Sequence, residues 1–156
     1  MAADKTPLDL DQGDMHHLES FGTLFRLPRD IAWDPQPGFP PLSLENALLH
    51  GNQNNSGVYM ALVRLYPGFM SAPHRYASDR LCVVLSGTWW INSGPTFNAA
   101  TCVAVPTGSF VKRLARTPHY DGVIAEASSP VVIAICGMAP LMPELLDPAQ
   151  PGWRCI

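Results

Sequence analysis

Charge is scarce in this chain, and lysine most of all. Charged residues make up 15% of the 156 residues, the formal net charge is −3, and Lys5 and Lys112 are the only lysines. Proteins that bind nucleic acids or anionic membrane surfaces concentrate basic charge, and this sequence has no excess of it. We therefore expect neither nucleic acid nor membrane among its partners.

Long hydrophobic runs are absent as well. No apolar run reaches the roughly 18 residues that a membrane-spanning helix requires. Residues Met1–Lys5 lack the apolar segment of a secretion leader. The sequence as written therefore predicts a cytoplasmic protein, with a periplasmic one as the alternative if a leader has been removed.

The cysteines do not form a Cys-x-x-Cys pair, which argues against a zinc ribbon or a redox motif of that kind. Cys82 and Cys136 lie inside the apolar runs Leu81–Leu85 and Val131–Gly137. We expect them to be buried free thiols that pack as small hydrophobic residues.

Hydrophobic residues, prolines and glycines are plentiful. The hydrophobic fraction of 47% is enough for a real core, and the length suits one domain. The 16 prolines and 12 glycines are spread along the chain and separate short β-rich runs, and no convincing helical periodicity is present. This punctuation predicts an all-β barrel or sandwich.

We expect a single domain over residues 1–156, with a loose segment over 1–19, a barrel over about 20–138 and an extension over 139–156 that packs outside the barrel or on a partner. The proline-rich segment Trp33–Pro41 is expected to be an irregular, rigid loop over the barrel, since proline supplies no amide donor. A first strand is expected within Phe21–Leu27. The later strands are predicted at 58–66, 80–85, 88–91, 101–105, 109–114, 122–127 and 131–136, and about eight to ten strands suffice to close a barrel.

Three side chains are candidates for a shared pocket. Side chains alternate faces along a strand, so His74 and Tyr76 point the same way. His119 lies on a later strand and is expected to meet His74 across the barrel. His74 belongs to a unit that runs from Gly68 to Gly87, and His119 follows Pro106-Thr107-Gly108.

These two units resemble the paired motifs of the cupin family, the RmlC-like jelly-roll proteins. The first family motif runs Gly, five residues, His-x-His, three or four residues, Glu, six residues and Gly; the second is Pro-x-Gly followed by a His. The runs SGTWW, GSFV and HYDG resemble one bacterial branch of small single-domain cupins. The resemblance implies an antiparallel jelly-roll β-barrel and, because small cupins commonly pair through barrel faces, a homodimer.

The chain departs from the family pattern at several positions. Tyr76 stands where the second His is usual, and Arg80 stands where the Glu ligand is expected, with Asp79 one place early. Arg113 stands where the bacterial branch tends to have a His. Asp121, next to His119, is expected either to orient that imidazole or to serve the turn at Gly122.

The resemblance implies a divalent metal ion, iron, manganese, nickel or zinc, with His74, His119 and Tyr76 as ligands. Cupin metal sites need three or four donors and an open position for substrate. Tyr76 and Asp79 are the candidate catalytic groups, although the spacing of Asp79 puts it on the opposite face from His74 unless the strand is bulged. Substrate contacts are expected from Arg75, Arg113 and Trp89.

Two hypotheses about function follow, and both have a small-molecule partner. The first is a cupin-type enzyme, a metal-assisted oxygenase, lyase or isomerase that acts on an oxygen-rich substrate. The second is a metal-free cupin that binds or senses a small, partly apolar ligand, with arginine recognising an acid group. The missing His and Glu ligands favour the second hypothesis.

Overall fold

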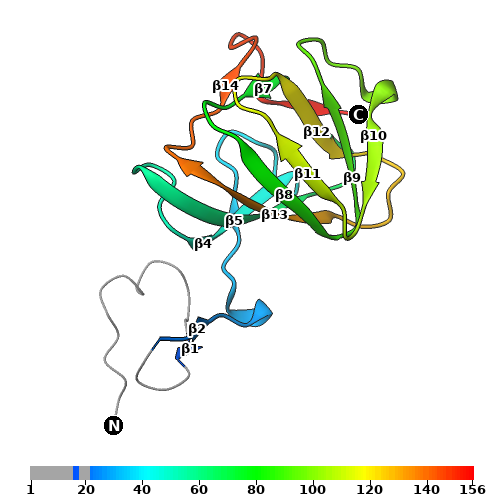
Figure 1. Ribbon diagram of the computed structural model, residues 1–156. Helices are drawn as coiled ribbons and strands as arrows, with labels where there is room; N and C mark the ends of the chain where they lie inside the picture. The colour runs from blue at the N-terminus through cyan, green and yellow to red at the C-terminus, as the bar shows by residue number, and fades with distance from the viewer. Residues whose placement is uncertain (1–15, 18–21) are drawn as a thin grey trace.

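The computed structural model describes residues 16–17 and 22–156. Two antiparallel sheets packed face to face form its barrel (Figure 1). The first sheet has the strand order β11-β8-β13-β5-β4-β3. Its strands are β3 (Asp34–Pro35), β4 (Leu44–His50), β5 (Gly57–Leu65), β8 (Arg80–Ser86), β11 (Phe110–Arg113) and β13 (Val131–Ala139).

The second sheet has the path β10-β9-β12-β6-β15, with β7 paired to β12 and β14 paired to β7. Its strands are β6 (Phe69–Ser71), β7 (His74–Arg75), β9 (Thr88–Ser93), β10 (Val103–Pro106), β12 (His119–Val123), β14 (Glu144–Leu145) and β15 (Trp153–Cys155). A separate pair, β1 (His16–His17) and β2 (Leu24–Phe25), lies below the barrel in Figure 1.

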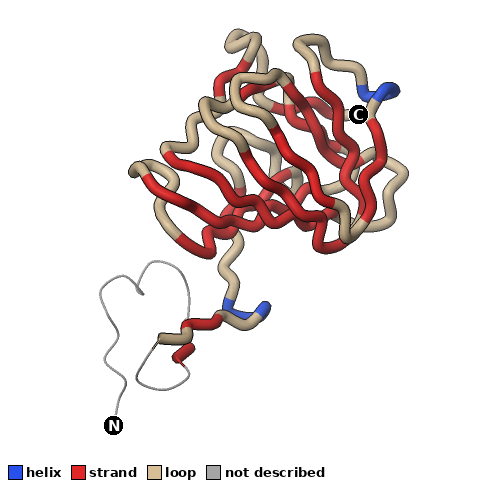
Figure 2. Tube along the Cα trace, viewed as in Figure 1, coloured by secondary structure: helices blue, strands red, loops and turns tan. Residues whose placement is uncertain are grey.

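Strand and loop account for almost all of the described chain, as Figure 2 shows. The only helical pieces among the described residues are the 3-10 turns η2 (Pro28–Asp30) and η3 (Ala99–Thr101), so none of those residues forms a helix that could cross a membrane. The all-β, antiparallel jelly-roll prediction is confirmed.

Alternation along the strands builds the core between the sheets. In β8, Arg80, Cys82 and Val84 are buried, while Leu81, Val83 and Leu85 are exposed on the outer face. The main core cluster joins such inward residues from both sheets: Tyr59, Ala61, Leu65, Cys82, Val84, Trp89, Val123, Val131, Ile133, Ile135 and Ala139. Cys82 is buried as predicted, whereas Cys136 is only partly buried.

Each predicted strand in the central block has a counterpart, but one is misplaced. The strand expected over 122–127 is β12, which begins at His119 and ends at Val123. It ends there because the amide of Ala127 donates to the carbonyl of Ile124 in a turn. The strand expected within Phe21–Leu27 is reduced to Leu24–Phe25, and most of the segment 1–19 lies outside the described residues.

Two proline-rich segments are more regular than expected. Residues 139–156 do not pack outside the barrel: β15 extends the second sheet by pairing with β6, and β14 pairs with β7. Within Trp33–Pro41, Asp34 and Pro35 form the edge strand β3 beside β4. Proline is tolerated at an edge because the missing amide removes no ladder hydrogen bond there.

Candidate ligand-binding site

A cavity of about 480 Å³ lies inside the barrel. The first sheet gives it an apolar wall that includes Ala61, Val63, Ile133 and Ile135. The loop Gln36–Phe39 also lines it, in agreement with the prediction that this proline-rich segment covers the barrel. The rest of the lining comes from Leu141, Pro143, Leu145 and Gly152 near the C-terminus and from polar residues of both sheets.

The two predicted histidines lie next to each other, and His74 lines this cavity. His74 on β7 and His119 on β12 are paired residues of neighbouring strands, and their ring centroids are 4.5 Å apart. The Nδ1 atom of His74 lies 2.8 Å from the carbonyl of Ala72, and that of His119 lies 2.9 Å from the carbonyl of Thr117. Both contacts require Nδ1 to carry the proton, so Nε2 of each neutral ring is left with a lone pair.

The Nε2 lone pair of His119 accepts a hydrogen bond from Arg80. The Nη2 atom of Arg80, which donates, lies 2.7 Å from Nε2 of His119. The guanidinium also lies over the ring of Tyr76, with its central carbon 3.6 Å from the ring centroid. Arg80, at the position of the usual metal-binding Glu, lines the cavity and is hydrogen-bonded to His119, which does not line it.

A second arginine is neutralised within the protein. Arg113 Nη2 lies 3.1 Å from Asp121 Oδ2, and Arg113 Nη1 donates to the carbonyl of Asn92. Burial alone would raise the pKa of Asp121, but the charge of Arg113, with that of Arg80 acting in the same direction, holds that pKa below its ordinary value. Asp121 is therefore a carboxylate that is already paired.

Arg80, by contrast, is a buried cation that forms no salt bridge among the described residues, although the more distant charge of Asp121 acts on it. Arg80 is 8% exposed, and its partners among the described residues are the His119 imidazole and the Tyr76 ring. Burial raises the pKa of Tyr76, with Arg80 acting in the opposite direction, so the phenol is neutral at neutral pH. The cluster of Arg80, Arg113 and Asp121 thus carries one uncompensated positive charge.

We expect the free energy of unfolding to fall as the pH is lowered from about 7 to about 5.5. Burial lowers the pKa of both His74 and His119, whereas in the unfolded chain each titrates near 6.5. Below that value the unfolded chain binds protons that the folded protein does not, so stability is lost, by about 1 kcal/mol per histidine over this range. Urea denaturation at several pH values measures this; His119→Gln should remove about half of the slope, and a flat wild-type profile would contradict the account.

The donors in the cavity do not fit a metal ion. The described part of the chain contains no group of three or more His, Cys, Asp or Glu side chains placed to hold one. Of the predicted ligands, His119 accepts a hydrogen bond from Arg80, and Tyr76 lies beneath that guanidinium as a neutral phenol. A divalent cation would also stand next to the fixed charge of Arg80. We therefore derive no chemistry through a metal, and the predicted metal site stays a prediction.

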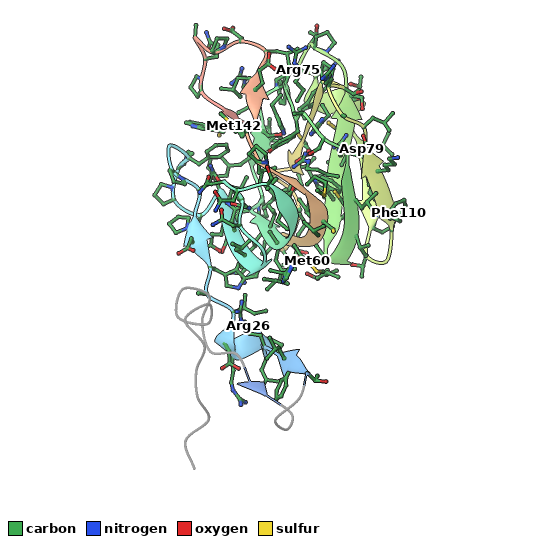
Figure 3. The ribbon with its side chains drawn as sticks, turned by 60° about the vertical axis from the view of Figure 1, so that its left-hand side comes forward. Arg26, Met60, Arg75, Asp79, Phe110 and Met142 are labelled. Carbon is green, nitrogen blue, oxygen red and sulfur yellow. The ribbon has the colours of Figure 1, made fainter. Side chains whose placement is uncertain are left out.

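Two residues expected at the site lie away from it. Asp79 bonds Lys112 on the outside, with Oδ2 2.9 Å from Nζ, and its Oδ1 accepts from the amide of Ala115. Arg75 pairs with the exposed carboxylate of Glu144, with Nε 2.9 Å from Oε2 (both labelled residues, Asp79 and Arg75, can be found in Figure 3). Neither side chain lines this cavity, so the catalytic role of Asp79 and the substrate contact of Arg75 stay predictions.

Of the two other residues expected to contact substrate, one lines the cavity and one does not. Trp89 lines the cavity, as expected. Arg113 is buried beside it and bound to Asp121, so it shapes the site through that carboxylate. Two residues that line the cavity, Tyr59 and Arg80, were not among the site residues predicted from the sequence. The replacement of the motif Glu by Arg was the available signal for Arg80.

Comparison with solved structures decides the fold. RemF, a polyketide cyclase from Streptomyces resistomycificus, is 12% identical with a TM-score of 0.65, over 83% of this chain and 90% of that one. A cupin-2 domain from Rhodospirillum rubrum, Rru_A2000, is 17% identical with a TM-score of 0.59, over 85% of each chain. The chain has the cupin fold.

A third similar structure is the DMSP lyase DddQ from Ruegeria pomeroyi, with 13% identity and a TM-score of 0.57. The alignment covers 74% of this chain and 60% of DddQ, so this chain spans less than two thirds of that protein. No family model and no curated protein matches the sequence. At these identities the likeness establishes the cupin fold alone.

Proposed function

We propose that this cupin binds a small carboxylic acid in its cavity without a metal ion, with Arg80 as the partner of the carboxylate. The observation that carries the proposal is the buried guanidinium of Arg80, which lines the cavity and forms no hydrogen bond or salt bridge with a carboxylate among the described residues. A buried charge is costly unless it is paired, and a bound anion would pair it. Arginine suits a carboxylate because its planar donors match the two oxygens.

The size and the apolar lining of the cavity indicate what kind of body the acid has. Its volume of about 480 Å³ is in the range of small-molecule sites. The same cavity is lined by the apolar side chains of Ile133, Ile135, Leu141 and Leu145, and the ring of Trp89 lies beside Arg113. An aromatic or short aliphatic body would bury its apolar surface there, so the proposed ligand is an acid with a compact apolar body.

Benzoate and benzamide test the proposal, because they share a shape and differ in charge. We expect metal-free protein, prepared with a chelator, to bind benzoate at least about tenfold more tightly than benzamide, since hydrogen bonds to charged groups are the stronger ones. Isothermal titration calorimetry measures both affinities. Equal affinities, or benzoate binding that appears only after a divalent metal is added, would contradict the proposal.

A second candidate function is metal-free proton transfer. Nδ1 of His74 is used by the carbonyl of Ala72, while Nε2 has no hydrogen-bond partner among the described residues and the side chain lines the cavity. A neutral imidazole in that state is a base. Deuterium uptake from D₂O into a bound acid, followed by NMR, would support this candidate if His74→Gln abolished it. The metal-assisted oxygenase, lyase or isomerase stays a prediction.

The predicted homodimer has a candidate surface. The outer face of the first sheet carries apolar side chains that are 40–64% exposed: Val58, Met60, Leu81, Val83, Leu85, Phe110 and Met138. Strand pairing brings them together, with Val58 opposite Met138 and Phe110 opposite Val83 (Met60 and Phe110 are labelled in Figure 3). We expect sedimentation to give twice the chain mass of 17.0 kDa and Val83→Arg to give monomers; a monomeric wild type would contradict this.

A further inference from the structure

Tyr59, Gly137 and Arg80 form a row across the inner face of the first sheet. Tyr59 on β5 is the register partner of Gly137 on β13, and Gly137 is in turn the partner of Arg80 on β8. The side chains of Tyr59 and Arg80 both line the cavity, and the residue between them has no side chain. The row therefore places a phenol and a guanidinium on either side of an empty position.

The ring of Tyr59 leans over that empty position. A Cβ atom added to Gly137 would lie 3.0 Å from both Cε1 and Oη of Tyr59. The hydroxyl thus lies above β13, on the side toward Arg80, instead of above its own strand. Neighbouring strands are about 4.8 Å apart, so the hydroxyl stands within about one strand spacing of the Arg80 strand.

Both groups of this row carry a buried donor without an acceptor. Tyr59 is 1% exposed, and neither its Oη nor Nε of Arg80 has a hydrogen-bond partner among the described residues. Burial raises the pKa of Tyr59 to about 12, against the opposing charge of Arg80, so the phenol keeps its proton and can donate it. Buried donors of this kind are rare in folded proteins, and a bound acceptor is one explanation for them.

We propose that Tyr59 sets the specificity of the cavity for carboxylic acids that carry a hydroxyl or oxo oxygen on the carbon next to the carboxylate. This inference rests on the proposed carboxylate site at Arg80. The two donors come from the strands on either side of β13 and would bind two neighbouring groups of one ligand. Arg80 binds the carboxylate, and Tyr59 Oη donates to the oxygen beside it. A site with a buried donor discriminates against ligands that leave this donor unpaired.

Three acids with one carbon skeleton test the inference: 3-phenylpropionate, 3-phenyllactate and phenylpyruvate. We expect metal-free wild-type protein to bind the two oxygenated acids about tenfold more tightly than 3-phenylpropionate, the size of effect of one hydrogen bond in a buried site. Tyr59→Phe should remove this preference and leave the affinity for 3-phenylpropionate unchanged. Calorimetry gives the ratio of affinities, which a merely structural role of Tyr59 would not alter selectively.

Two further variants make the result decisive. Gly137→Ala keeps the hydroxyl but pushes it away from its place over β13, and should also reduce the preference. Tyr66→Phe is the matched control, because the Tyr66 hydroxyl donates to Glu45 outside the cavity; it should leave the preference intact. Equal binding of all three acids by the wild type, or a preference that survives in Tyr59→Phe, would overturn the inference while the carboxylate site stands. No binding of any of the acids would overturn the carboxylate site itself.

Discussion

Arg80→Met is expected to abolish carboxylate binding without unfolding the protein. The guanidinium is the uncompensated cation at the cavity, and truncating one partner of a buried charge pair costs about 2–5 kcal/mol, which is a loss of at least about thirtyfold in affinity. Benzoate titrations of the variant and the wild type measure this loss. The affinity for neutral benzamide should change little, because the cavity keeps its shape.

The stability of the Arg80→Met variant should move the other way. Replacing a buried charge that lacks an opposite charge by an apolar side chain of similar length is often neutral or stabilising. We expect the midpoint of thermal unfolding to stay equal or rise, as at other sites where function is kept at the expense of stability. Arg64→Met is the matched control: this arginine pairs with Glu45 and lies over Trp33, away from the cavity lining, and benzoate should bind that variant normally. A variant of Arg80 that still binds benzoate would remove the basis of the proposal.

The double substitution Tyr76→His with Arg80→Glu is expected to turn the cavity into a metal site. It restores both residues of the family motif and removes the donor that occupies Nε2 of His119. His74, His119 and the two new side chains would then supply the nitrogen and oxygen donors that zinc and manganese accept. We expect one equivalent of Zn²⁺ to bind and to raise the free energy of unfolding by about 2.7 kcal/mol when free zinc is at a hundredfold excess over its dissociation constant.

The control for this gain is the single substitution Tyr76→His, which adds a ligand and leaves Arg80 in place. It should bind zinc far more weakly than the double variant, because His119 remains bonded and the cation remains beside it. Zinc bound equally well by both variants would show that Arg80 does not obstruct a metal.

The fold was predictable because its local signals agree with its tertiary structure. Gly87 separates β8 from β9, and it adopts a φ of 75°, which favours glycine. The strands that were predicted wrongly are those whose limits are set by pairing with distant strands. β15 has little intrinsic strand signal and exists because the open edge of β6 accepts it. β12 begins earlier than its sequence suggests, because β9 and β7 pair with its first residues.

The candidate site was predictable only in part. The motif spacing identified His74 and His119, and strand alternation placed Tyr76 on the same side as His74. Asp79, in the irregular segment just before β8, faces outward to Lys112. What the sequence did not reveal depends on contacts across the barrel: the reach of Arg80 to His119, the pairing of Arg113 with Asp121, and the position of Tyr59 over Gly137.

The metal content of the wild-type protein tests the central claim most directly. Protein purified without a tag, stripped with a chelator and dialysed against Zn²⁺, Mn²⁺, Fe²⁺ or Ni²⁺ is analysed for bound metal, and the same samples are titrated with benzoate. We expect the protein to bind far less than one equivalent of each metal, and we expect its affinity for benzoate not to depend on the metal added. One equivalent of metal bound at His74 and His119, with benzoate binding only in its presence, would contradict the central claim.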